Sequence, residues 1–125
     1  MIPRIETNPI SFGYSSVLKD HWRKGHMPSV TKDVYGDVLK DATIEHIIPK
    51  SKGGATKLFN FALANEATNN MRGNKPILEF TTKENLEAWY KQFKDIKLPK
   101  FNGNDYIKQS TEYLAKNGIK LDIKV

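Results

Sequence analysis

The chain of 125 residues contains no cysteine. This absence excludes a disulfide framework and a zinc site built from thiolates. Long apolar runs are missing as well, since no stretch approaches the ~20 residues of a membrane-spanning helix. The N-terminus also lacks the continuous apolar segment of a signal peptide. These absences favour an intracellular, cytoplasmic protein with no membrane partner.

Acidic residues are in the minority. The sequence has 14 Asp and Glu against 20 Lys and Arg, which gives a net charge of +6. One interpretation is a polyanionic partner such as nucleic acid, and the other is an ordinary basic protein. The excess is concentrated between His46 and Lys75, where five basic residues stand against Glu66 alone.

No internal repeat or low-complexity segment is visible, and the length suits a single domain over residues 1–125. The patterns predict an α+β fold with small β content. Its motif core covers about 42–75, and its helical flanks cover about 15–25 and 82–117. The first dozen residues contain two prolines and are expected to form an irregular arm.

The central segment predicts a strand, a loop, a second strand and a helix. The first strand covers residues 42–48 (ATIEHII), which are rich in β-branched side chains, and Pro49 ends it. The second apolar run covers residues 58–64 (LFNFALA). The helix follows over residues 64–74 (ANEATNNMRGN), with Asn65 as its N-cap.

The flanking helices are predicted from apolar residues at three- and four-residue spacings. The first begins at Ser15 or Ser16, and the later two have Thr82 and Asn104 as N-caps. The side chains at these spacings, expected in the core rather than as platforms for base stacking, are Val17, Leu18, Trp22, Leu86, Trp89, Tyr90, Phe93, Tyr106, Ile107, Tyr113 and Leu114. A small hairpin is expected around residues 35–37.

A group of polar residues in the centre indicates hydrolytic chemistry. Glu45 and His46 are adjacent and point to opposite faces of a strand, while Asn65, Asn69 and Arg72 share one helix face. If the helix docks on the strand, Glu45 or His46 meets Asn69. Carboxylate and amide oxygens suit Mg²⁺ or Mn²⁺, a histidine can accept a proton from water near pH 7, and an arginine can hold a phosphate. Phosphodiester hydrolysis needs these parts.

The order of residues in this segment is also informative. An acidic residue and a histidine are followed by a proline, a basic loop with two glycines, a central asparagine and an asparagine on a helix. The residues that carry this pattern are Glu45, His46, Pro49, Ser51, Lys52, Gly53, Gly54, Asn60, Asn69, Arg72 and Gly73. In this respect the segment 45–75 resembles the core of the HNH (His-Asn-His) endonuclease family.

The resemblance implies a ββα-metal finger and a role for each matched residue. His46 would be the general base that activates water, and Asn60 would fix the loop between the strands. Glu45 and Asn69 would bind one divalent metal ion, Mg²⁺ or Mn²⁺, and Arg72 would contact the scissile phosphate. Cleavage of DNA would leave a 5′-phosphate and a 3′-hydroxyl.

The segment differs from the common HNH pattern at several positions. Asn69 stands where a histidine is usual, which makes an HNN form, and Asn70 is the alternative to Asn69 if the register is shifted by one. Glu45 stands where aspartate is usual, and Asn65 and Thr68 occupy positions at which many relatives have zinc-binding cysteines. Packing must therefore replace zinc. The residues expected to supply it are Leu58, Phe59, Phe61, Leu63, Met71 and Phe80.

Five basic residues are expected to contact DNA phosphates, which position a nucleic acid without reading its sequence. They are Lys50, Lys52, Lys57, Arg72 and Lys75. No separate reader motif is present, so we expect low sequence specificity, or specificity supplied by a partner protein or a homodimer. The HNN form resembles phage and bacterial genome-processing nucleases. Two alternatives stay open: a nucleic-acid-binding module that does not cut, and a small structural or assembly protein.

Overall fold

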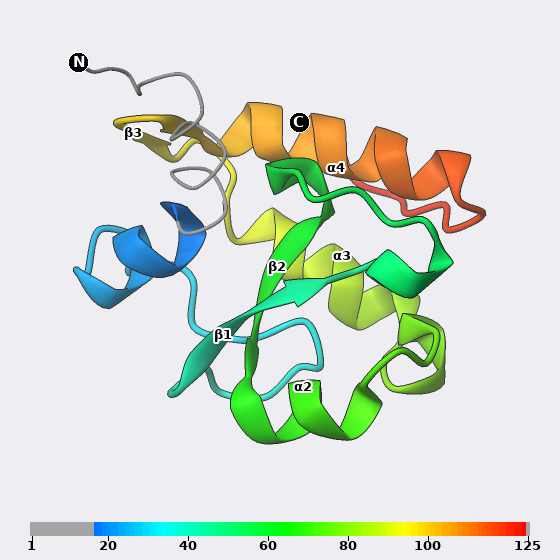
Figure 1. Ribbon diagram of the computed structural model, residues 1–125. Coiled ribbons are helices and arrows are strands. Elements are labelled where there is room, and N and C mark those ends of the chain that lie inside the picture. Colours follow the sequence, from blue (N-terminus) through cyan, green and yellow to red (C-terminus); the bar gives the residue numbers. More distant parts are fainter. Residues whose placement is uncertain (1–16, 125) are drawn as a thin grey trace, which may run out of the picture.

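The centre of the fold is a two-stranded antiparallel sheet with a helix packed against it (Figure 1). The computed structural model describes residues 17–124. Strand β1 (Ala42–His46) pairs with β2 (Phe61–Asn65), so that Ala42 lies opposite Asn65 and His46 lies opposite Phe61. Helix α2 (Glu66–Arg72) follows β2 without a break and contacts both strands. The described residues therefore have the predicted α+β character and the predicted order of elements.

The other elements surround this centre. They are a helix whose described part covers residues 17–23, the 3₁₀ helices η2 (Lys50–Lys52), η3 (Leu58–Asn60) and η4 (Ile77–Glu79), the strands β3 (Lys97–Leu98) and β4 (Phe101–Asn102), and the helices α3 (Lys83–Lys91) and α4 (Gly103–Lys116). In Figure 1, α2 and α4 lie at opposite ends of the β1–β2 sheet, and α3 lies between them. No helix within residues 17–124 is long and apolar enough to span a membrane.

Several predicted boundaries shift in the structure. Strand β1 ends two residues earlier than predicted, and residues 58–60 form η3 instead of the start of the second strand. Asn65 precedes α2 as expected, but its side chain makes no capping hydrogen bond. Its Oδ1 accepts instead from the backbone N–H groups of Lys40 (2.9 Å) and Asp41 (3.2 Å). The predicted arm and the Ser15 or Ser16 cap lie outside the described residues.

The helix caps give one confirmed and one wrong prediction. Thr82 caps α3 as expected, because its Oγ1 accepts from the Asn85 N–H (3.1 Å). The prediction of Asn104 as the cap of α4 is wrong: the cap is Asn102, whose Oδ1 accepts from the Asp105 N–H (3.0 Å). Gly103 already belongs to the helix, and the Asn104 side chain accepts a hydrogen bond from the Asp95 N–H instead (2.9 Å).

Aromatic side chains of α3 and α4 form the main core. Most of the predicted stripes are confirmed: Trp89, Tyr90 and Phe93 are fully buried, whereas Trp22 and Tyr113 are only partly buried against the core. Tyr106 of α4 packs against Phe93 edge to face, with ring centroids 5.0 Å apart. Its hydroxyl donates to the carbonyl oxygen of Phe61 (2.5 Å), which ties the helical core to the start of β2.

The packing expected to replace zinc is confirmed only in part. Phe61 and Leu63 are buried in the core. Leu58 and Phe80 are partly buried and pack against this core. Met71 is wrong as a core residue, because 70% of its side chain is exposed. The inward position on the last turn of α2 belongs to its neighbour Arg72, and consecutive residues on a helix point about 100° apart.

We expect Tyr106→Phe to lower the free energy of unfolding by about 2 kcal/mol. The substitution removes the bond to the Phe61 carbonyl and leaves Trp89 Nε1, which donates to the Tyr106 hydroxyl at 3.1 Å, without its acceptor. Tyr90→Phe is the matched control, since the buried Tyr90 hydroxyl has no hydrogen-bond partner among the described residues. Its effect should stay below about 1 kcal/mol. Urea unfolding measures both, and equal losses would contradict the role given to Tyr106.

The same tyrosines predict a loss of stability in alkali. Burial raises the pKa of Tyr90 and that of Tyr106 above the ordinary value. Above a pH of about 10 a tyrosine in the unfolded chain releases its proton, whereas the buried tyrosines of the folded protein keep theirs. The free energy of unfolding therefore falls by up to about 1.4 kcal/mol for each pH unit and for each of these tyrosines. The free energy of unfolding, measured from neutral pH to beyond this value, should decline less steeply with pH for Tyr90→Phe than for the wild type.

Candidate active site

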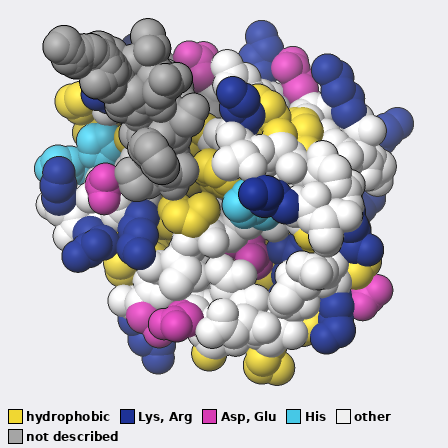
Figure 2. Space-filling model, in the orientation of Figure 1, with side chains coloured by type: hydrophobic (Ala, Val, Ile, Leu, Met, Phe, Trp, Pro, Cys, Tyr) yellow, Lys and Arg dark blue, Asp and Glu magenta, His cyan; other side chains and the backbone are white. Residues whose placement is uncertain are grey.

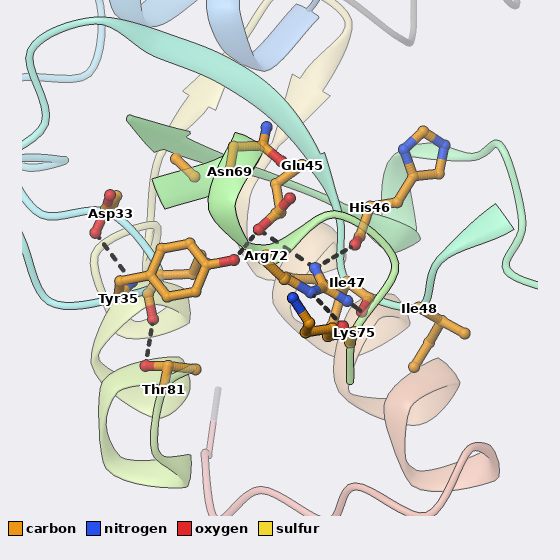
Figure 3. Close-up of polar contacts among 12 residues, drawn as sticks. Asp33, Tyr35, Glu45, His46, Ile47, Ile48, Asn69, Arg72, Lys75 and Thr81 are labelled. Carbon is orange, nitrogen blue, oxygen red and sulfur yellow. Dashed lines mark hydrogen bonds and ion pairs between the residues drawn. The ribbon is translucent and has the colours of Figure 1, made fainter. Parts of the chain in front are cut away.

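The end of β1 carries the two residues that the sequence singles out. Alternation along the strand sends their side chains to opposite sides. Glu45 points into the protein with 3% of its surface exposed, whereas His46 is half-buried. Figure 3 shows the two side chains pointing away from each other, with Asn69, Tyr35 and Arg72 on the side of Glu45. The structure therefore brings Asn69 to Glu45 and not to His46.

The Glu45 carboxylate is held by two donors on one oxygen. The Tyr35 hydroxyl donates to Oε2, and Arg72 Nη1 lies 3.3 Å from the same atom (Figure 3). Burial raises the pKa of Glu45, and the hydrogen bond from Tyr35 and the charge of Arg72 act against that rise. Burial and the neighbouring carboxylate also raise the pKa of Tyr35. The other carboxylate oxygen, Oε1, has no hydrogen bond to any described residue.

Arg72 joins the end of α2 to the end of β1. Its Nη1 donates to the His46 carbonyl (2.8 Å), its Nη2 to the Ile47 carbonyl (2.8 Å) and its Nε to the Lys75 carbonyl (2.7 Å). Only 1% of the residue is exposed. The phosphate contact expected from the sequence does not fit this arrangement, because the guanidinium is turned inward and largely occupied by protein acceptors.

Asn69 lies beside Glu45 on the inward face of α2 (Figure 3). Its Nδ2 donates to Thr43 Oγ1 (2.8 Å) and to the Ile44 carbonyl (3.2 Å). These bonds fix the amide on β1 and leave Oδ1 with no hydrogen bond to a described residue. The neighbouring Asn70 is exposed. The structure therefore places Asn69, and not Asn70, beside Glu45.

The oxygens of Glu45 and Asn69 fit a small divalent cation. Glu45 Oε1 and Asn69 Oδ1 are hard donors, and Mg²⁺ is commonly bound by one or two carboxylates while it keeps water and phosphate oxygens as its other ligands. Within residues 17–124 no three His, Cys, Asp or Glu residues are grouped as a metal cluster would need. The donor set thus suits a cation that shares its coordination with a phosphate.

His46 presents a nitrogen without a partner. Its Nε2 is buried and has no hydrogen bond to a described residue. The ring packs edge-on against Phe61, with centroids 4.9 Å apart. Burial lowers the pKa of His46, and the positive charges of Lys50 and Arg72 lower it further. A lowered pKa keeps the imidazole neutral at neutral pH, so its unprotonated nitrogen can accept a proton.

Asn60 fastens the loop that follows β1. It is fully buried, and its Oδ1 accepts from the Ile48 N–H (2.8 Å). Its Nδ2 donates to the carbonyls of Ile48 (2.9 Å) and Ala55 (2.8 Å). The backbone carbonyl of Asn60 also accepts from the Ile47 N–H (2.9 Å). These bonds hold the chain directly after His46, which is the arrangement expected of the central asparagine.

The glycine pair closes the same loop on itself. A Cβ at Gly54 would lie 1.9 Å from the Ile48 carbonyl oxygen, so no larger residue fits there. The Gly54 N–H donates to the Pro49 carbonyl (3.0 Å). Gly53 has φ +84°, a conformation that side-chain-bearing residues rarely adopt. Gly54 is therefore required by the close approach of the loop to its own backbone, and Gly53 is favoured by its positive φ.

The remaining basic residues named by the sequence lie at the surface. Lys50, Lys52, Lys57 and Lys75 are all exposed. Figure 2 shows that Lys and Arg side chains are spread over this face of the molecule, with fewer acidic side chains between them. Lys50 begins η2, shortly after the end of β1, and its positive charge contributes to the lowered pKa of His46. The four lysines are placed where a nucleic acid could reach them.

Tyr35 is a site residue that the sequence argument missed. The sequence indicates only a small hairpin at this position, and the structure confirms it with a single bridge between Lys32 and Val38. Nothing in the local spacing shows that the phenol reaches Glu45, ten residues further along the chain. A signal could have come from the aromatic residue itself, since a tyrosine in a polar turn often packs inward with a partner for its hydroxyl.

Comparison with protein families confirms the resemblance. The model of the HNH endonuclease family matches residues 31–75, which include Tyr35 as well as the motif. Residues 31–75 are therefore similar to the HNH endonuclease family. Members of the family generally act on DNA and use a divalent metal ion. Searches of curated proteins and of solved structures gave no match.

We expect Asn60→Asp to destabilise the protein although the two side chains have nearly the same size. A carboxylate can accept from the Ile48 N–H, but it cannot donate to the carbonyls of Ile48 and Ala55, and its charge would be buried beside them. The loss should be on the order of 3 kcal/mol. Asn70→Asp, at an exposed position, is the control and should change stability by less than about 0.5 kcal/mol. Similar denaturant midpoints for both variants would show that the Asn60 amide does not hold the loop.

Proposed function

We propose that this protein is a metal-dependent endonuclease that hydrolyses phosphodiester bonds of DNA. The observation that carries the proposal is the coincidence of the HNH match with three polar side-chain atoms, two at the end of β1 and one on α2, that have no partner among the described residues. These atoms are His46 Nε2, Glu45 Oε1 and Asn69 Oδ1, none of which has a hydrogen bond to a described residue. A structural or assembly role gives no reason for such a group, so the family match disfavours that alternative.

His46 is the general base of the proposed reaction. Its lowered pKa keeps the imidazole neutral at neutral pH, and the unprotonated ring nitrogen takes the proton of the attacking water. The water oxygen forms a bond to phosphorus as the bond from phosphorus to the 3′ oxygen breaks. The leaving 3′ oxygen takes a proton from solvent, and the products are a 3′-hydroxyl and a 5′-phosphate.

Glu45 and Asn69 would hold the divalent cation, Mg²⁺ or Mn²⁺, through Oε1 and Oδ1. The cation would supply neutralisation of the charge on the phosphate. The Asn69 side chain is held in place for this role, because its Nδ2 donates to Thr43 Oγ1 and to the Ile44 carbonyl. One carboxylate and one neutral amide make a weak protein site, and the phosphate of the substrate would strengthen the binding of the cation.

Arg72 and Asn60 have positioning roles in this proposal. Arg72 fixes the carbonyls of His46 and Ile47 and pairs with Glu45, so it sets the strand end on which base and ligand both lie. Asn60 fixes Ile48, two residues after the base. This replaces a direct phosphate contact by Arg72, for which the buried guanidinium gives no support.

The exposed lysines would bind the DNA backbone. Lys50, Lys52, Lys57 and Lys75 can contact phosphates without reading bases, so low sequence specificity or a partner that supplies specificity is expected. A second candidate function is a module that binds DNA and does not cut it. The ion pair between Glu45 and Arg72 favours this candidate, because the guanidinium offsets the negative charge that a metal ion needs.

The deciding experiment is conversion of supercoiled plasmid to nicked and linear forms with Mg²⁺, Mn²⁺ or EDTA. We expect metal-dependent cleavage that His46→Ala reduces at least about 100-fold, since general-base catalysis is typically worth that much. DNA binding should survive in this variant because the lysines are unchanged. His26→Ala is the matched control: His26 is exposed and its ring bonds to His21 (3.0 Å).

The outcomes separate the candidate functions. Cleavage that is lost in His46→Ala and kept in His26→Ala supports the endonuclease and the base together. Salt-sensitive binding without cleavage in any metal would favour the non-cutting module. Equal cleavage by His46→Ala and the wild type would exclude His46 as the base.

A further inference from the structure

The turn that carries Tyr35 is fixed from several directions. Asp33 Oδ1 accepts from the Tyr35 N–H (2.9 Å), and Asn85 Nδ2 donates to the Tyr35 carbonyl (3.3 Å). Thr81 Oγ1 donates to the carbonyl of Val34 (2.8 Å). These contacts come from its own turn, from α3 and from the residue before the α3 cap. The backbone of Tyr35 is therefore held in place independently of what its side chain touches.

The phenol of Tyr35 reaches inward to Glu45. The residue is 9% exposed, and its hydroxyl donates to Glu45 Oε2, the oxygen that Arg72 Nη1 also approaches at 3.3 Å (Figure 3). Both donors thus act on one carboxylate oxygen. The second oxygen, Oε1, is left without a donor among the described residues, on the side chain that lies next to Asn69.

Arg72 alone would not fix this asymmetry. A free guanidinium tends to bind a carboxylate with two parallel hydrogen bonds, one to each oxygen. Here its Nε and Nη2 are engaged by the carbonyls of Lys75 and Ile47, and its Nη1 is shared between the His46 carbonyl and Glu45. The arginine therefore offers Glu45 one long contact. The hydroxyl of Tyr35 is the donor that defines which oxygen of Glu45 is occupied.

We propose that Tyr35 is a positioning residue that engages Glu45 Oε2 with its hydroxyl and so reserves Oε1 for a divalent cation held together with Asn69. This inference rests on the proposed function, in which Glu45 and Asn69 are the metal ligands. Tyr35 itself touches neither metal nor substrate. Tyr35 acts by fixing the orientation of the Glu45 carboxylate. Without the tyrosine hydroxyl the carboxylate can rotate, so that either oxygen can face Arg72 or water.

The test is titration of Mn²⁺ into the metal-free protein, followed by calorimetry, with the unfolding temperature of each variant measured beside it. We expect Tyr35→Phe to bind Mn²⁺ on the order of tenfold more weakly, the effect of losing one hydrogen bond to a charged group. Glu45→Gln should lose binding. Tyr90→Phe makes the same chemical change at another buried tyrosine and should bind as the wild type does.

The variants distinguish failure of this inference from failure of the proposed function. If Glu45→Gln loses Mn²⁺ binding while Tyr35→Phe keeps wild-type affinity, the metal site stands and the role of Tyr35 is wrong. If the wild type binds no Mn²⁺, or Glu45→Gln binds it unchanged, the proposed metal ligands are wrong and the inference fails with them. A Tyr35→Phe variant with a lower unfolding temperature and unchanged Mn²⁺ affinity would show a purely structural role, which also overturns it.

Discussion

The buried guanidinium of Arg72 is the interaction on which the arrangement of the site depends. A charge removed from water is costly unless it is paired and hydrogen-bonded, and Arg72 meets both conditions through Glu45 and three backbone carbonyls. These contacts reach from the end of α2 to the end of β1 and to the chain beyond the helix. The histidine and the carboxylate of the proposed site are consecutive residues on that strand end, so one side chain sets the frame for both.

A second set of hydrogen bonds surrounds Asn65 at the junction of β2 and α2. The side chain of Asn65 accepts from the N–H groups of Lys40 and Asp41 and donates to the carbonyl of Val38 (2.8 Å). Asp33 Oδ2 accepts from the Asn65 N–H (3.1 Å). The segment before β1 is thereby fastened to the junction of β2 and α2. Together with the contacts of Thr81 and Asn85, this fastening holds the turn from which Tyr35 reaches Glu45.

Local patterns predicted the parts of this structure that are determined locally. The β-branched run at β1 and the apolar spacing of α3 and α4 each depend on near neighbours along the chain. The inward turn of Arg72 was not predictable, because an arginine on a helix face can point to solvent or to the core, and the choice depends on acceptors 25 and 26 residues away. The contact between Tyr35 and Glu45 depends on how the 33–41 segment packs against β1, and the exposure of Met71 depends on how α2 packs against the sheet. Neither packing arrangement can be read from sequence spacing.

The acceptors of Arg72 are backbone carbonyls of residues 46, 47 and 75, and this has a consequence for variation among related sequences. Every amino acid supplies a backbone carbonyl, so these hydrogen bonds of Arg72 place no demand on the side chains at the three positions. Lys75 is exposed and could change to almost any residue without loss of the contact. Replacement of Arg72, or an insertion that shifts the chain between α2 and Lys75, would break it. Tolerance to substitution combined with intolerance to a change of length is therefore the pattern that this segment should show.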